Sequence, residues 1–196
     1  MTMKRSLASA ALILGLPLLA QADPGLQPRN QAQIQASGSG YNGVLSVNQA
    51  AGQYQQQSNA RAIAVGDGSS ASVGQRQNLQ IEAPDTAMNA SASIHGAAFS
   101  GGSGVVGVNQ SAGAGTQQIN ALRISVNAAP VSLDDDMLSQ TAAFTQNSSP
   151  ADSTTGERQV VTDDQAFVGS RGVVQLNQSA GVGNRMVNTL SIRVVD

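Results

Sequence analysis

The feature that most constrains this chain is a 23-residue segment that occurs three times, in copies that align with one another without a gap. Nine of its 23 positions are identical in all copies: a leading Gly-Val, an Asn-Gln pair, an Ala-Gly pair, a later Asn, and a final Ile-x-Val. An internal repeat of this kind predicts stacked structural units rather than one ordinary core. The copies are residues 43–65 (GVLSVNQAAGQYQQQSNARAIAV), 104–126 (GVVGVNQSAGAGTQQINALRISV) and 172–194 (GVVQLNQSAGVGNRMVNTLSIRV).

Each copy predicts two β-strands around a glycine-containing turn. In the third copy Leu190, Ile192 and Val194 alternate with residues of the opposite face, and this period of two is a strand signal. Glycines such as Gly181 permit positive φ in the turn. We therefore expect an all-β fold of three imperfect β-arc or β-hairpin repeats, stacked as a β-solenoid-like or cross-β array with partly disordered spacers.

The invariant amides are the candidate stacking and self-association residues. An amide on an apolar strand face is costly unless its hydrogen bonds are satisfied, and stacking identical strands satisfies them as a ladder. The alternative is that these amides lie in solvated turns. The candidate ladder of the second strand is Asn59, Asn120 and Asn188, and those of the first strand are Asn48, Asn109 and Asn177, and Gln49, Gln110 and Gln178.

The chain start has the pattern of a secretory signal peptide. Lys4 and Arg5 precede an apolar run, and Ala20-Gln21-Ala22 matches an A-x-A cleavage site, so we expect export and no transmembrane segment in the mature chain. The predicted divisions are a signal peptide at 1–22, repeat units at 23–65, 89–126 and 157–196, a spacer at 66–88, and an acidic polar linker at 127–156.

Shorter segments outside the 23-residue copies carry weaker signals. Each copy is preceded by an alternating stretch that predicts a further strand, so each unit resembles a three-strand module. These stretches are 31–37, 90–96, and 158–162 with 165–169. In the spacer and the linker we expect a short strand at 78–82 and a brief helix at 133–144.

Composition excludes several function classes. Without residues 1–22 the chain has 8 arginines and no lysine against 12 acidic residues, a formal net charge of −4 that argues against nucleic-acid binding. The chain has no cysteine, and aromatic residues are only 3% of it. Thiolate chemistry, a disulfide framework and an ordinary large core are therefore excluded.

No catalytic or cofactor constellation is present in the sequence. His95 is the only histidine, and we expect it on the solvent side of a strand. The acidic run 134–136 lacks the spacing of a calcium loop, and no phosphate-binding loop follows the glycines. We expect a protein that is not an enzyme and holds no cofactor or metal.

The repeats resemble those of the Fap functional-amyloid system and, more distantly, curlin repeats. The shared pattern is G-V-x-x-N-Q-x-A-G-x-x-x-x-x-x-N, and residues 178–184 are similar to a curlin turn with one residue added. The resemblance covers the three copies. It implies a secreted protein of cross-β fibres that reinforce a biofilm matrix and mediate adhesion, with a fibre subunit or further copies of itself as partners and an export machinery that delivers it.

Two departures favour an accessory or minor component over the main fibre subunit. The resemblance implies a Cys-x-Cys near the C-terminus of main subunits, whereas this sequence ends SIRVVD. Arg61 replaces a leucine in the first copy, and we expect a stacked charge there to repel neighbours in register. The roles left open are nucleator, modulator or periplasmic chaperone of the fibre, the fibre subunit itself, and a monomeric β-solenoid adhesin.

Overall fold

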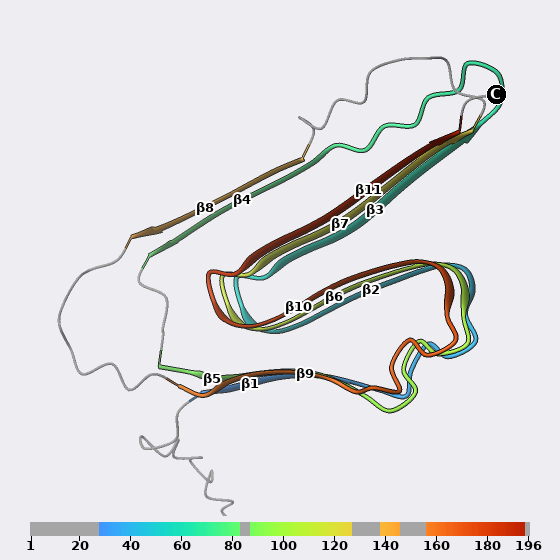
Figure 1. Ribbon diagram of the computed structural model, residues 1–196. Helices are drawn as coiled ribbons and strands as arrows, with labels where there is room; N and C mark the ends of the chain where they lie inside the picture. Colours follow the sequence, from blue (N-terminus) through green and yellow to red (C-terminus); the bar gives the residue numbers. More distant parts are fainter. Residues whose placement is uncertain (1–27, 83–86, 127–137, 146–155, 195–196) are drawn as a thin grey trace, which may run out of the picture.

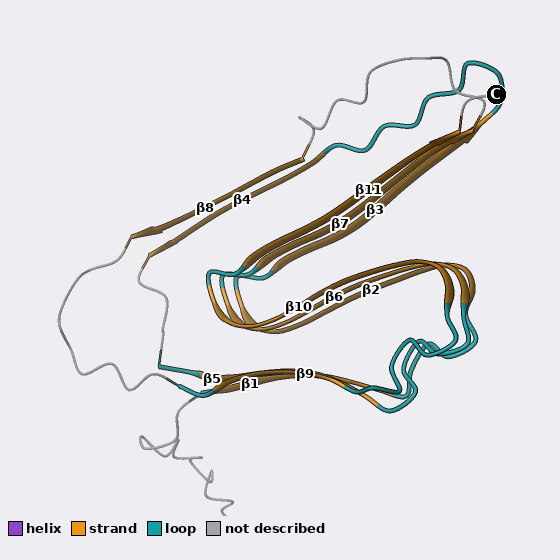
Figure 2. Ribbon diagram, in the orientation of Figure 1, coloured by secondary structure: helices purple, strands orange, loops and turns teal. Residues whose placement is uncertain are grey.

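The computed structural model describes residues 28–82, 87–126, 138–145 and 156–194. The predicted signal peptide and the acidic run 134–136 lie outside these residues. The described part is all-β, as the repeats predict, and contains no helix (Figure 2). Its strands are β1 Arg29–Gln35, β2 Asn42–Gln53, β3 Gln56–Val65, β4 Gln75–Glu82, β5 Asn89–His95, β6 Ser103–Ala114, β7 Gln117–Val126, β8 Leu138–Thr145, β9 Arg158–Thr162, β10 Arg171–Val182 and β11 Arg185–Val194.

The strands form four parallel sheets that lie as successive layers (Figure 1). Sheet A has the order β1-β5-β9, sheet B β10-β6-β2, sheet C β11-β7-β3 and sheet D β4-β8. The chain runs through the layers from A to D and then returns to A. We call each such pass a rung: rung 1 is β1 to β4, rung 2 is β5 to β8, and rung 3 is β9 to β11.

The three copies stack in register in sheets B and C. Each position of one copy pairs with the same position of the next, which lies 61 residues away between the first two copies and 68 residues away between the last two. The two strands of a copy pair with other copies and not with each other. The repeat is therefore a β-arc rather than a β-hairpin.

The weaker strand signals have mixed outcomes. Strands β1, β5, β9 and β4 confirm the predictions at 31–37, 90–96, 158–162 and 78–82. The segment 165–169 is a turn and not a strand. The helix predicted at 133–144 is wrong for its described part, because Leu138–Thr145 is strand β8. Its long-range parallel pairing with β4 outweighs the local pattern.

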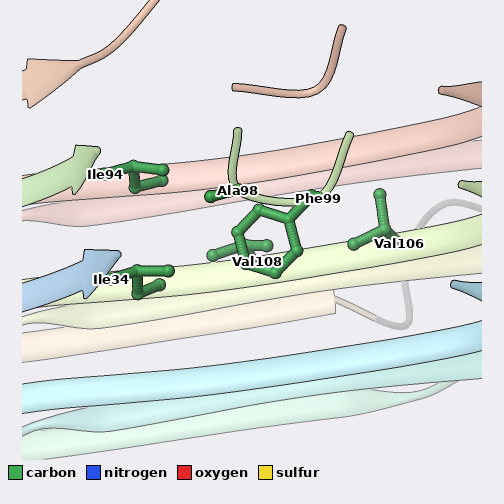
Figure 3. Close-up of a cluster of buried hydrophobic side chains, with 6 residues drawn as sticks. All are labelled: Ile34, Ile94, Ala98, Phe99, Val106 and Val108. Atoms are coloured by element: carbon green, nitrogen blue, oxygen red, sulfur yellow. The ribbon is translucent and has the colours of Figure 1, made fainter. Parts of the chain in front are cut away.

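Small apolar clusters between sheets A and B replace a large core. Ile94, Phe99 and Val108 are buried with neighbours from both sheets (Figure 3). Phe99 of rung 2 stacks on Phe167 of rung 3 with ring centroids 5.1 Å apart. Rung 2 is the most enclosed part of sheets B and C, since most positions of β6 and β7 are buried whereas β2 and β11 have no buried position.

Candidate functional site

The amides of sheet B that face sheet C form one ladder along the stacking direction. Asn109 Nδ2 donates to Asn48 Oδ1 at 3.0 Å, and Asn177 Nδ2 donates to Asn109 Oδ1 at 3.0 Å. Each side chain therefore donates toward the preceding rung and accepts from the following one. This direction is the same at both steps, so the ladder is polar.

The neighbouring glutamines form a second ladder on the face toward sheet A. Gln110 Nε2 donates to Gln49 Oε1 at 2.8 Å, and Gln178 Nε2 donates to Gln110 Oε1 at 2.8 Å. The same Nε2 of Gln110 also reaches the backbone carbonyls of Ala32 and Ser93 in sheet A. The glutamine ladder therefore connects sheets A and B as well as the rungs.

The asparagines of sheet C form the third ladder and join it to the first. Asn120 Nδ2 donates to Asn59 Oδ1 at 3.0 Å, and Asn188 Nδ2 donates to Asn120 Oδ1 at 3.0 Å. Within rung 2, Asn120 Nδ2 also donates to Asn109 Oδ1 at 3.0 Å across the interface of sheets B and C. Equivalent bonds occur in the other rungs, from Asn59 to Asn48 and from Asn188 to Asn177.

All nine candidate amides thus lie in ladders within two sheet interfaces and not in solvated turns. The central three, Asn109, Gln110 and Asn120, have no exposed surface. A net hydrogen bond contributes about 1 kcal/mol, whereas a buried amide without its partner costs about 1–3 kcal/mol. The ladders therefore make any other register costly, and their part in association between chains remains a proposal.

Sequence reasoning missed two further ladders near the β-arc. Gln57 Nε2 donates to Gln118 Oε1 at 2.9 Å, and Gln117 Nε2 donates to Gln56 Oε1 at 2.9 Å. The third copy has Arg and Met in their place. These positions are not identical in all copies, which is why the invariant pattern did not select them. Glutamines shared by two of the three copies would have been the signal.

The invariant glycines allow the rungs to approach closely. Gly113 has φ +122°, and a Cβ atom there would overlap the carbonyl oxygen of Gly181 in the next rung. Gly104 has φ +123°, and a Cβ atom there would overlap the carbonyl oxygen of Gly43 in the preceding rung. Both the backbone conformation and the stacking distance therefore require glycine at these positions.

Arg61 does not repel its register neighbours, which corrects the expectation from the sequence. It pairs with Leu122, which in turn pairs with Leu190, so no charge stacks on another. Its guanidinium donates to Ser46 Oγ and to the Leu45 carbonyl, and it occupies the space left by the missing side chain of Gly107. Partial burial lowers the pKa of Arg61 below its ordinary value.

In the part of the chain that the structure describes, no group of three His, Asp or Glu residues could hold a metal. His95 is half-buried at the end of β5. The pKa of Asp163 is lowered by the backbone N–H of Gln165 and then by that of Gly96, a pattern typical of a turn carboxylate.

The two ends of the stack are strand edges that have no further sheet partner among the described residues. Strands β1, β2 and β3 have one neighbour each and form the rung-1 end, and β9, β10 and β11 form the rung-3 end. Strand edges of this kind can accept further strands.

Among residues 28–82, 87–126, 138–145 and 156–194, no helix has the length and apolar character needed to cross a membrane.

Comparison with known proteins agrees with this geometry. The sequence model of the functional amyloid protein FapB/FapC family matches residues 19–195, which is nearly the whole chain. No solved structure matches the chain.

Proposed function

We propose, from the premise that this chain belongs to the functional amyloid protein FapB/FapC family, that it is a minor or nucleating component of an extracellular amyloid fibre. Family membership makes it a structural amyloid protein that is exported from the cell. The finer role is our proposal: the folded chain enters the fibre as a block of three rungs and offers a template to incoming strands.

The observation that carries this proposal is the register of the three copies. Twelve consecutive positions of β6 pair with the same positions of β2 and of β10, with no shift. A chain that stacks its own copies in this way presents, at each end, edges that match another copy of the repeat. A fibre subunit with the same pattern can therefore continue the ladders of Asn109, Gln110 and Asn120.

The open edges support this role over that of a periplasmic chaperone. A chaperone that prevents fibre growth needs an edge that binds a strand and blocks the next one. At both ends of this stack the edge strands retain the side chains of the repeat, including the amides Asn48 and Asn188. The same stacking also suits the fibre subunit itself, and we favour the minor component because only nine of the 23 positions of the repeat are identical in all three copies.

A seeding experiment tests the proposal. The folded chain is added at substoichiometric amounts to a cysteine-containing fibre subunit of the family, and thioflavin-T fluorescence follows assembly. We expect a shorter lag, because nucleation is replaced by addition to a ready edge. A longer lag would instead indicate a chaperone, and an unchanged lag would exclude both roles.

A matched pair of variants makes the seeding result specific. Gly113→Ala introduces a Cβ atom that overlaps the Gly181 carbonyl and should abolish seeding by disrupting the stack. Thr189→Ala changes an exposed position of the edge strand β11 and should seed like the unmodified chain. Equal seeding by both variants would show that the stacked rungs are not the template.

A further inference from the structure

The charged residues of sheets A, B and C are distributed so that no two arginines share a register column, where a column is the set of positions that pair across the rungs. Seven arginines occupy seven different columns. Within the chain, the paired neighbours of Arg61, Arg123 and Arg171 are uncharged. Like charges directly opposite one another in a sheet are destabilising, so this distribution favours stacking.

One column contains charges of opposite sign, and they lie at opposite ends of the stack. Arg29 begins β1 and pairs with Asn89 at the start of β5. Glu157 occupies the same column in rung 3, since Arg158 pairs with Ala90 and the backbone N–H of Glu157 donates to Asn89 Oδ1 at 2.8 Å. Arg29, Asn89 and Glu157 also line one surface hollow of about 270 Å³.

Within one chain these two charges are separated by the whole of rung 2. Parallel strands lie about 4.8 Å apart, so the backbones of Arg29 and Glu157 are roughly 10 Å apart. If the rung-3 end of one copy received the rung-1 end of a second copy in register, Glu157 would lie directly beside Arg29 of that second copy. The column would then hold an ion pair of adjacent strands at every junction between chains.

The polarity of the three ladders of invariant amides favours the same order of ends. In these three ladders the amide nitrogen donates toward the preceding rung and the oxygen accepts from the following one, whereas Gln57 donates in the opposite direction, to Gln118. The rung-1 end therefore directs Asn48 Nδ2 outward as a donor, and the rung-3 end directs Asn177 Oδ1 outward as an acceptor. A contact between two rung-1 ends would place donor against donor, and a contact between two rung-3 ends would place acceptor against acceptor.

We propose that this chain adds to a second copy of itself head to tail, with its rung-3 end on the rung-1 end of the next copy, and that Glu157 and Arg29 select this junction. The inference rests on the proposed function and specifies its partner surface. Such a junction is heterologous and does not close, so it extends without limit along one axis. The other arginines of rung 3 meet uncharged positions there, as Arg171 does opposite Asn42.

A charge exchange tests the junction directly. Arg29→Glu places two carboxylates in the column of each junction, and Glu157→Arg places two guanidiniums there. We expect each single variant to elongate its own seeds about 3- to 10-fold more slowly, since cross-strand and exposed ion pairs have effects of this order. The double variant Arg29→Glu with Glu157→Arg restores opposite charges and should elongate at nearly the unmodified rate.

The controls separate this effect from net charge and from folding. Arg171→Glu changes the net charge by the same amount as Arg29→Glu, but it lies at the rung-3 end, where the junction places it opposite the uncharged Asn42. The elongation rate of this variant should therefore stay within about twofold of the unmodified rate. Circular dichroism of each variant verifies that the rungs remain folded. At about 1 M salt, where the Debye length is about 3 Å, the single variants should approach the unmodified rate.

The outcomes distinguish this inference from the proposed function. Slow single variants with a rescued double variant support the head-to-tail junction. Equal rates for all variants, or a double variant as slow as the singles, overturn the junction while fibre growth itself stands. A chain that shortens the lag of a fibre subunit but never elongates its own seeds also overturns the junction alone. A chain that does neither overturns the proposed function and the junction together.

Discussion

Asn177 Nδ2 donates to Asn109 Oδ1 at 3.0 Å although the two residues are 68 positions apart in the chain. They are the same position of two copies of the repeat, placed one above the other by the parallel pairing of β10 and β6. Because identical amides satisfy each other only in this register, one contact defines how the repeat folds and what a further copy must match.

Removal of the central asparagine of sheet C should destabilise the stack strongly. Asn120→Ala deletes the acceptor of Asn188 and of Asn177 and the donor to Asn59, all within buried or half-buried surroundings. We expect a loss of about 2–4 kcal/mol in the free energy of unfolding, because partner amides are left unsatisfied. Urea unfolding followed by circular dichroism measures it. Asn78→Ala, at an exposed position of β4, is the control and should change stability by less than about 0.5 kcal/mol.

Alanine at a stacked glycine should cost more than alanine at an unstacked one. Gly113 and Gly66 both have positive φ, +122° and +137°, so both substitutions strain the backbone by about 1–3 kcal/mol. A Cβ at Gly66 meets no atom within 4 Å, whereas a Cβ at Gly113 overlaps the Gly181 carbonyl. Thermal unfolding should therefore show a clearly larger loss for Gly113→Ala. Equal losses would mean that the rungs are not in close contact there.

Arg61 and Gly107 should behave as a coupled pair. Gly107→Ala overlaps the Arg61 guanidinium and also approaches Asn59 Oδ1, so it should destabilise the fold by about 1–3 kcal/mol through overpacking. In the Arg61→Leu background this cost should fall by about 1 kcal/mol, because one of the two obstructing groups is gone.

The control for this pair is Gly102→Ala, whose Cβ would overlap the ring of Tyr41 instead. Its cost should be the same with Arg61 and with leucine at that position. Urea unfolding of the six proteins measures both cycles. Strict additivity for Gly107 and Arg61 would show that the guanidinium does not fill the glycine space.

A phenylalanine in the middle of the stack should contribute more to the free energy of unfolding than a phenylalanine at its end. Phe99 in rung 2 is 1% exposed, whereas Phe167 in rung 3 is half-exposed. We expect Phe99→Ala to cost about 3–5 kcal/mol and Phe167→Ala about half as much, because the end residue has a rung on one side only. Denaturant unfolding of both variants makes the comparison, and equal costs would argue against rung 2 as the interior.

The repeat made much of the fold predictable. Prediction from the sequence failed at segments that lie outside the repeat and at positions where the copies differ. Asn59, Asn120 and Asn188 could be placed in one ladder because they share a position and a strand face. Strand β8 was not predictable, because Leu138–Thr145 becomes a strand only through its parallel pairing with Gln75–Glu82, a contact between distant segments.

The role of Arg61 was also beyond the local pattern. The sequence presents a charge where the other copies have leucine, but the space that accepts it belongs to Gly107 in a different strand and rung. A compensating pair of this kind becomes visible only when the register of the copies is known.

The most direct test of the three-rung stack is the axial rise per chain in fibres grown from this protein alone, measured by electron cryomicroscopy with helical reconstruction. A chain that contributes three rungs advances the fibre by about 14 Å, which is three strand spacings of about 4.8 Å. The structure predicts this value, with three stacked rungs visible for each chain. A rise of about 4.8 Å, with each chain forming a single rung, would contradict it.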